Sequence, residues 1–119
     1  MATVGSDAWI AAFARAARDR GAPVAVGEPL VVQLELTDTG AAWYVEVRGD
    51  GARVVAGRHP APDVTFSQDA ATAAAVNRGD LSAQAAFLDG RLQVRGAVGR
   101  LPAAAAALAA LPAVPGEAG

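Results

Sequence analysis

The segment LVVQLELTDTGAAWYVEVRGDGARVVA, residues 30–56, carries the strand pattern from which the fold can be inferred. Over residues 30–37 the even positions are apolar and the odd positions are mostly polar, and a similar alternation runs through residues 42–48 and continues into 52–56. The triplets DTG and GDG, which favour tight turns, separate these runs. Since successive side chains of a strand point to opposite faces, the pattern predicts three antiparallel strands with one covered face.

The three predicted antiparallel strands form a β-meander, and the segments before and after it predict helices and two more strands. Residues 7–20 carry apolar side chains at helical spacing, and Gly21 and Pro23 end that helix. Downstream, we expect a strand at 64–67, helices at 69–77 and 83–89, a strand at 92–95 and a helix at 102–111. The order α-β-β-β-β-α-α-β-α predicts the α+β class.

Length and composition fit one folded domain over residues 1–119, with a tail at 113–119 that we expect to fray. Hydrophobic residues make up 53% of the chain and charged residues 18%, which suits a buried core. No cysteine is present, so disulfides and thiolate metal sites are excluded. The net charge of -2 argues against a nucleic-acid partner. Arginine supplies every basic residue, as in many GC-rich bacterial genomes.

Membrane and export signals are also missing from the pattern. The first residues lack a basic segment followed by an apolar run, so we expect a cytoplasmic protein. The longest uncharged apolar stretch, residues 101–114, is shorter than the ~20 residues of a membrane span and contains Pro102 and Pro112. We therefore expect no transmembrane segment.

Residue types that could support catalysis are sparse. His59 is the single histidine, so no second histidine or cysteine can share a metal with it, and no Gly-x-Ser-x-Gly motif is present. The pair Gly49 and Gly51 has Val54 where a dinucleotide-binding motif needs a third glycine. The sequence therefore predicts a protein that is not an enzyme, with no catalytic residue, no metal and no cofactor.

The segment GDLSAQAAFLDGRLQVRG, residues 79–96, resembles the signature of the sterol carrier protein type two family. The matching positions are Gly79, Leu81, Gln84, Ala86, Phe87, Gly90, Arg91, Leu92, Val94 and Gly96. Residues 63–67 are similar to the fourth strand of that family, and residues 43–45 to its second. Two positions depart from the family pattern: Ala97 replaces a frequent Asp or Asn, and alanines at 103–107 replace large aliphatic side chains.

This resemblance implies a twisted, five-stranded, mostly antiparallel sheet with helices packed over one face. It also implies an apolar tunnel between sheet and helices that binds a sterol, fatty acid, acyl-CoA or phospholipid. The residues we expect to contact such a ligand are Phe13, Phe66, Val76, Leu81, Phe87, Leu88, Leu92, Val94, Val98, Leu101, Ala105 and Leu108. A charged headgroup would need only a contact at the rim, for which Arg78, Arg91 and Arg100 are candidates, although surface arginines are usually just solvated.

The last helix supports a cavity on physical grounds as well. Because this helix is apolar on every side, it must be covered by the protein core, by a ligand or by a partner chain. Its alanines fill little volume, and a space left beneath them would favour an apolar guest. Tryptophan in place of Val98 or Leu101 is expected to block ligand uptake.

A second hypothesis keeps the fold but fills the cavity. Leu101, Leu108 and Leu111 have the spacing of a helix seam, which could join two copies or dock a partner enzyme. The protein is accordingly expected to be a monomer or a homodimer through its C-terminal helix. As a lipid carrier, it could also contact membranes transiently.

Overall fold

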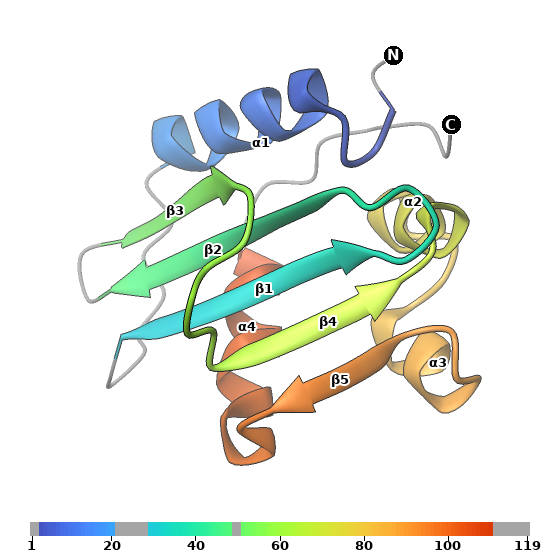
Figure 1. The fold of residues 1–119 in the computed structure, drawn as a ribbon. Coiled ribbons are helices and arrows are strands. Elements are labelled where there is room, and N and C mark those ends of the chain that lie inside the picture. The colour runs from blue at the N-terminus through green and yellow to red at the C-terminus, as the bar shows by residue number, and fades with distance from the viewer. Residues whose placement is uncertain (1–2, 21–28, 49–50, 111–119) are drawn as a thin grey trace.

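A computed structural model describes residues 3–20, 29–48 and 51–110 (Figure 1). In chain order the elements are α1 (Asp7–Arg20), β1 (Leu30–Leu36), β2 (Ala42–Arg48), β3 (Gly51–Ala56), β4 (Val64–Gln68), α2 (Ala70–Arg78), α3 (Ala83–Leu88), β5 (Gln93–Gly96), the 3₁₀ turn η1 (Val98–Arg100) and α4 (Leu101–Ala110). This order and the α+β class confirm the expectation from sequence. Leu111 and the tail expected to fray lie outside the described residues.

The strands form one sheet in the order β3-β2-β1-β4-β5. Among the described strands, β1 and β4 pair in parallel, with Leu34 opposite Phe66, and the other neighbours pair antiparallel. The sheet is therefore mixed but mostly antiparallel, as expected. The parallel pairing arises because the chain leaves β3 at one edge, crosses the sheet and returns beside β1 (Figure 1).

The apolar face of the meander forms the core. Its side chains are buried at Leu30, Val32, Leu34 and Leu36 on β1 and at Trp43, Val45 and Val47 on β2. At the first turn the backbone N–H of Gly40 donates to the carbonyl of Leu36, and Gly40 has a φ of 77°. That left-handed conformation favours glycine and lets the chain reverse.

Helices cover the same apolar face. In Figure 1, α1 lies along β3 at one edge, α4 passes behind the strands, and α2 and α3 lie beside the strand ends on the right. On α1, Trp9 and Ile10 are buried, and the Trp9 ring centroid is 5.0 Å from that of Trp43 on β2. Helices over one face of a five-stranded sheet match the expectation.

Capping residues set the ends of α2. Asp69 accepts a hydrogen bond from the backbone N–H of Thr72 at 2.7 Å. Hydrogen bonds from the side chain of Thr72, and then from its backbone, hold the pKa of the Asp69 carboxyl below its usual range. At the other end Gly79, with φ 83°, donates to the carbonyl of Val76, and the N–H of Asp80 bonds to Ala75. This pair of bonds is a Schellman motif.

A second Schellman motif ends the six-residue helix α3. The hydroxyl of Ser82 accepts from the N–H of Ala85 at its start. At its end Gly90, with φ 78°, donates to Phe87, and Arg91 donates to Ala86. Gly79 and Gly90 thus end two short helices, and the turn at Gly90 directs the chain into β5.

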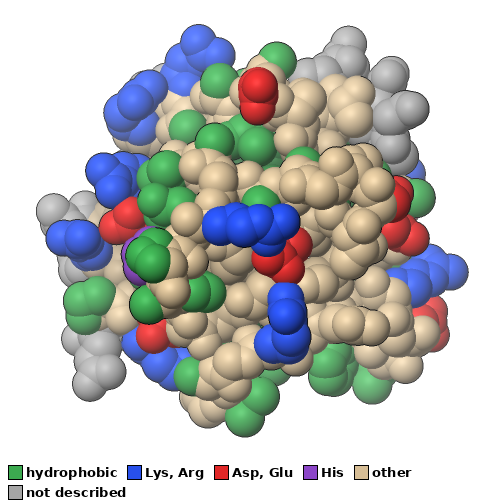
Figure 2. All heavy atoms as spheres, viewed as in Figure 1, with side chains coloured by type: hydrophobic (Ala, Val, Ile, Leu, Met, Phe, Trp, Pro, Cys, Tyr) green, Lys and Arg blue, Asp and Glu red, His purple; other side chains and the backbone are tan. Residues whose placement is uncertain are grey.

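The other face of the sheet carries charge but is not wholly open. Glu35 pairs with Arg58 and Arg95, and Figure 2 shows basic and acidic side chains in contact over this face. On the same face Glu46 bonds to Arg53, which lowers the pKa of the Glu46 carboxyl.

Gln33, expected on the uncovered face, is in fact buried. Its Nε2 donates to the carbonyls of Trp43 and Gly57, and its Oε1 accepts from the N–H of His59. The loop after β3 passes over this point, so the side chain ties the loop to the sheet. The prediction of one covered face was therefore incomplete here, because strand alternation does not report a loop that crosses from elsewhere.

Candidate functional site: an apolar cavity between sheet and helices

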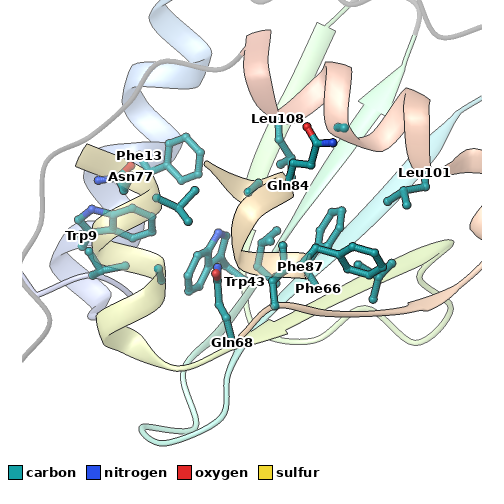
Figure 3. A pocket seen from close by; sticks show the side chains of 18 residues that line it. Trp9, Phe13, Trp43, Phe66, Gln68, Asn77, Gln84, Phe87, Leu101 and Leu108 are labelled. Carbon is teal, nitrogen blue, oxygen red and sulfur yellow. The ribbon is translucent and has the colours of Figure 1, made fainter. Parts of the chain in front are cut away.

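A cavity of about 600 Å³ lies between the covered face of the sheet and the helices (Figure 3). Its wall is built by strands β1, β2, β4 and β5, by all four α-helices and by short flanking segments. The lining residues are Val4, Trp9, Phe13, Leu34, Trp43, Phe66, Gln68, Ala73, Val76, Asn77, Ala83, Gln84, Phe87, Leu92, Val94, Leu101, Ala105 and Leu108. A volume of this size is in the range of small-molecule sites.

The wall is almost entirely apolar. Among the described residues that line it, Gln68, Asn77 and Gln84 are the polar ones, and none is charged. Such a surface can hold hydrocarbon by removing it from water, and it offers no counter-ion to a buried charge. The arrangement is suited to an apolar guest.

Small side chains on α4 help to leave this space open. Ala104 and Ala107 are fully buried against the core, while Ala105 contributes only a methyl group to the wall. Leu101 and Leu108 line the same cavity (Figure 3). Hence two of the three leucines expected in a helix seam face the cavity, and the third lies outside the described residues.

The cavity is open to solvent beside α3. Phe87 lines the wall and is nevertheless 48% exposed, so its ring lies at the mouth. Ala83 and Gln84 on the preceding turn also line the wall and are exposed. These exposed lining residues show that solvent reaches the cavity beside α3.

The structure brings together nine of the twelve side chains that the sequence singled out. On the cavity wall are Phe13, Phe66, Val76, Phe87, Leu92, Val94, Leu101, Ala105 and Leu108. They come from α1, β4, α2, α3, α4, β5 and the residue just before β5, so segments far apart in the chain meet at one space.

Leu88 and Val98, two of the remaining three, are corrected to surface positions. Leu88 ends α3 and is 75% exposed, because the helix buries Ala86 and turns its last residue away from the wall. Val98 is 69% exposed, since η1 lies beyond β5 at the edge of the sheet. Apolar identity alone placed both residues in the predicted site.

Leu81 is likewise not on the wall. It is partly buried against the core. The Schellman motif at Gly79 turns the chain back on α2, and the N–H of Leu81 reaches the carbonyl of Ala75 at 3.3 Å. Such a turn typically packs the residue that follows it against the end of its own helix.

Comparison with known proteins identifies the family. Residues 13–108 match the SCP-2 sterol transfer family. The chain belongs to this family. The match includes the whole segment 79–96 and confirms the resemblance noted there. Comparison with curated protein sequences gives no match.

Solved structures show where else the SCP-2 fold occurs. Two structures of the sec-alkylsulfatase Pisa1 from Pseudomonas sp., one of them a double mutant, align with TM-scores of 0.54 and 0.66 at 19% and 18% identity. The alignments cover 65% and 91% of this chain but only 12% and 16% of those chains. This SCP-2 chain thus spans a small part of the sulfatase.

Two smaller relatives match over almost their whole length. Palmitated SCP2L2 from Aedes aegypti aligns with a TM-score of 0.63 at 18% identity, over 91% of this chain and 94% of that one. The apo form of sterol carrier protein 2 from Yarrowia lipolytica gives 0.56 at 19% identity, over 82% and 96%. At these identities the likeness establishes the SCP-2 fold.

Sequence reasoning missed half of the cavity wall of this SCP-2 chain. The unpredicted lining residues are Val4, Trp9, Leu34, Trp43, Gln68, Ala73, Asn77, Ala83 and Gln84. The sequence pattern could have identified Trp43 and Leu34 as lining residues, because both lie on the predicted apolar face of the sheet. No pattern signalled Gln68, since a polar residue ending a strand looks like a surface position.

Among the described residues, the side chains considered for metal binding, catalysis or headgroup binding do not gather at this cavity. Within the described ranges, no group of three or more His, Asp and Glu side chains could hold a metal ion. His59 lies on the opposite side of the sheet, where its ring contacts Tyr44 and its Nδ1 accepts from Ala61. Of the proposed headgroup arginines, Arg78 bonds to Asp80 and Arg100 to the carbonyl of Pro29.

No helix among the described residues is long and apolar enough to span a membrane.

Proposed function

We propose that this protein binds one lipid-like molecule in the apolar cavity and carries it without catalysing a reaction. The observation that supports this most strongly is a cavity of about 600 Å³ whose wall has three polar residues and no charged one among those described. Membership of the SCP-2 sterol transfer family and the palmitated state of a structural neighbour point the same way.

Hydrophobic burial is sufficient for useful affinity. A chain of ~15 methylenes, at ~0.8 kcal/mol each, gives about 12 kcal/mol of favourable transfer. Association and ordering cost roughly 4–15 kcal/mol, which leaves an affinity around micromolar when the cost is near its lower limit. Such a complex is tight enough to carry a lipid and weak enough to release it.

The rival hypothesis of a filled interaction module receives less support. It placed Leu101 and Leu108 in a seam between two copies, but both side chains line the cavity. A partner would have to bind through a different surface. The open mouth at Phe87 instead favours a site that exchanges a small molecule with solvent or with a membrane surface.

Native mass spectrometry of gently purified protein tests the proposal, together with displacement of a fluorescent fatty acid from delipidated protein. We expect a lipid adduct of one molecule per chain, and competitive displacement of the probe by unlabelled alkyl ligands. A bare mass combined with no uptake of the probe would overturn the proposal.

A further inference from the structure

Gln68, the last residue of β4, places an unpaired amide at the cavity (Figure 3). Its Oε1 is buried and has no hydrogen-bond partner in the described part of the protein. Its Nε2 likewise makes no hydrogen bond there. Figure 3 shows the amide end directed toward the indole of Trp43.

Other buried polar side chains in the described structure are satisfied by the protein itself. Gln33 bonds to the loop after β3, and the hydroxyl of Ser67 bonds to Glu35. Buried polar atoms are hydrogen-bonded in the large majority of cases. An amide that stays unpaired on the wall of an otherwise apolar cavity is therefore best explained by a partner group on the ligand.

The chemistry of the cavity wall favours a neutral group on the ligand as the hydrogen-bond partner of Gln68. No described lining residue is charged, so a carboxylate or phosphate placed beside Gln68 would be buried without a counter-ion. A hydroxyl both donates and accepts, so it can pair with either amide atom. The terminal torsion of glutamine is broad, and a rotation presents Oε1 or Nε2 to the cavity.

We propose that the ligand is a neutral lipid alcohol whose hydroxyl hydrogen-bonds to Gln68 while its hydrocarbon lies along Phe66 and Leu101. This inference rests on the proposed function and adds the chemical class and orientation of the ligand. In Figure 3, Phe66 and Leu101 lie to one side of Gln68, so a chain anchored at the amide would extend toward the ring of Phe66 and the side chain of Leu101.

Two matched ligands and two matched variants test the inference. 1-Dodecanol and 1-chlorododecane differ in the hydroxyl, and their affinities are measured by displacement of an apolar fluorescent probe. Gln68→Leu removes the amide, while Gln93→Leu makes the same change at an exposed position on β5 that does not line the cavity. We expect Gln68→Leu to weaken dodecanol binding about tenfold, the value of one net hydrogen bond, and to leave chlorododecane unchanged. Gln93→Leu should leave both affinities unchanged.

The wild-type protein alone provides a second test that does not depend on the variant folding. Dodecanol should bind at least as tightly as chlorododecane, because the amide compensates for desolvation of the hydroxyl. Dodecanoate serves as a third ligand, with a charged headgroup. Chlorododecane binding tenfold more tightly than dodecanol would overturn the inference while the cavity remains a lipid site. So would a loss of dodecanoate affinity in Gln68→Leu equal to the loss of dodecanol affinity. If none of the three ligands binds, both the inference and the proposed function fail.

Discussion

The indole rings of Trp9 and Trp43 meet edge to face across the cavity wall, with centroids 5.0 Å apart and planes at 65°. Trp9 belongs to α1 and Trp43 to β2, so this contact joins the first helix to the sheet at the ligand site. Phe13 extends the cluster, with its ring 5.2 Å from that of Trp9. Tilted aromatic pairs of this kind add to the stability gained by burial alone.

Tryptophan emission should therefore report occupancy of the cavity. The chain has two tryptophans, and both line the wall. Displacing cavity water with hydrocarbon should shift the emission to shorter wavelength and saturate at one ligand per chain. Trp43→Phe should reduce the change. Constant emission while mass spectrometry shows a bound lipid would place the ligand elsewhere.

Blocking the cavity should abolish binding without unfolding the protein. Ala105 on α4 lines the wall and is exposed, so Ala105→Trp can project a ring into the space. We expect at least a tenfold loss of alkyl-ligand affinity, with the thermal midpoint little changed. Val98→Trp is the matched control, because Val98 is 69% exposed and off the wall.

Equal loss in both tryptophan variants would mean that the effect is not steric blocking of the cavity. Retained affinity in Ala105→Trp, with the fold intact by circular dichroism, would show that ligands bind at another site. Leu101→Trp should weaken binding as well, although its larger original side chain makes unfolding a greater risk.

The cap of α2 should make stability depend on pH in a defined range. Asp69 accepts from Thr72, and its pKa is lowered in the folded state. A lowered folded pKa means that this stabilisation is complete above the unfolded pKa of about 3.9 and is lost as pH falls through the folded pKa. Asp69→Ala should cost about 1 kcal/mol at pH 7.

Urea unfolding at several pH values checks this prediction. The difference in unfolding free energy between wild type and Asp69→Ala should stay constant from pH 7 to about pH 5 and shrink below about pH 4. Asp69→Asn keeps a capping oxygen, so it should retain most of the stability at pH 7. A difference that grows as the pH falls would contradict the assigned role.

Gly96 should tolerate no side chain. Its φ is 105°, and a Cβ built there would collide with the backbone carbonyl of Asp63. Gly90→Ala is the matched control, because Gly90 also has positive φ but open space around it. We expect Gly96→Ala to be clearly more destabilising in urea unfolding than Gly90→Ala, by about 1–3 kcal/mol. Equal costs would show that backbone conformation alone requires glycine.

Much of the fold was predictable because its signals are local. Alternation defined the strands of the meander, and Gly79 and Gly90 fixed the ends of two helices. The parallel pairing of β1 with β4 was not specified by any local pattern. Gln33 was misjudged for the same reason, since the loop that buries it follows a different strand.

The candidate site was only partly predictable, because an apolar residue can face a cavity, the core or solvent. Leu92 and Leu88 are close in sequence and alike in chemistry, yet Leu92 lines the wall and Leu88 is exposed. Leu88 ends α3 on its exposed side, whereas Leu92 follows the turn at Gly90 and lies just before β5. Gln68 could not be found from sequence, because its significance comes from the absence of a partner around it.

Intermolecular nuclear Overhauser effects between the protein and a bound alkyl ligand would locate the lipid on the protein. We expect contacts from the ligand chain to Phe66, Leu92 and Leu108, and none to the exposed Leu88 and Val98. Contacts confined to Leu88 and Val98, or none at all at saturating ligand, would contradict a lipid site between the sheet and α4.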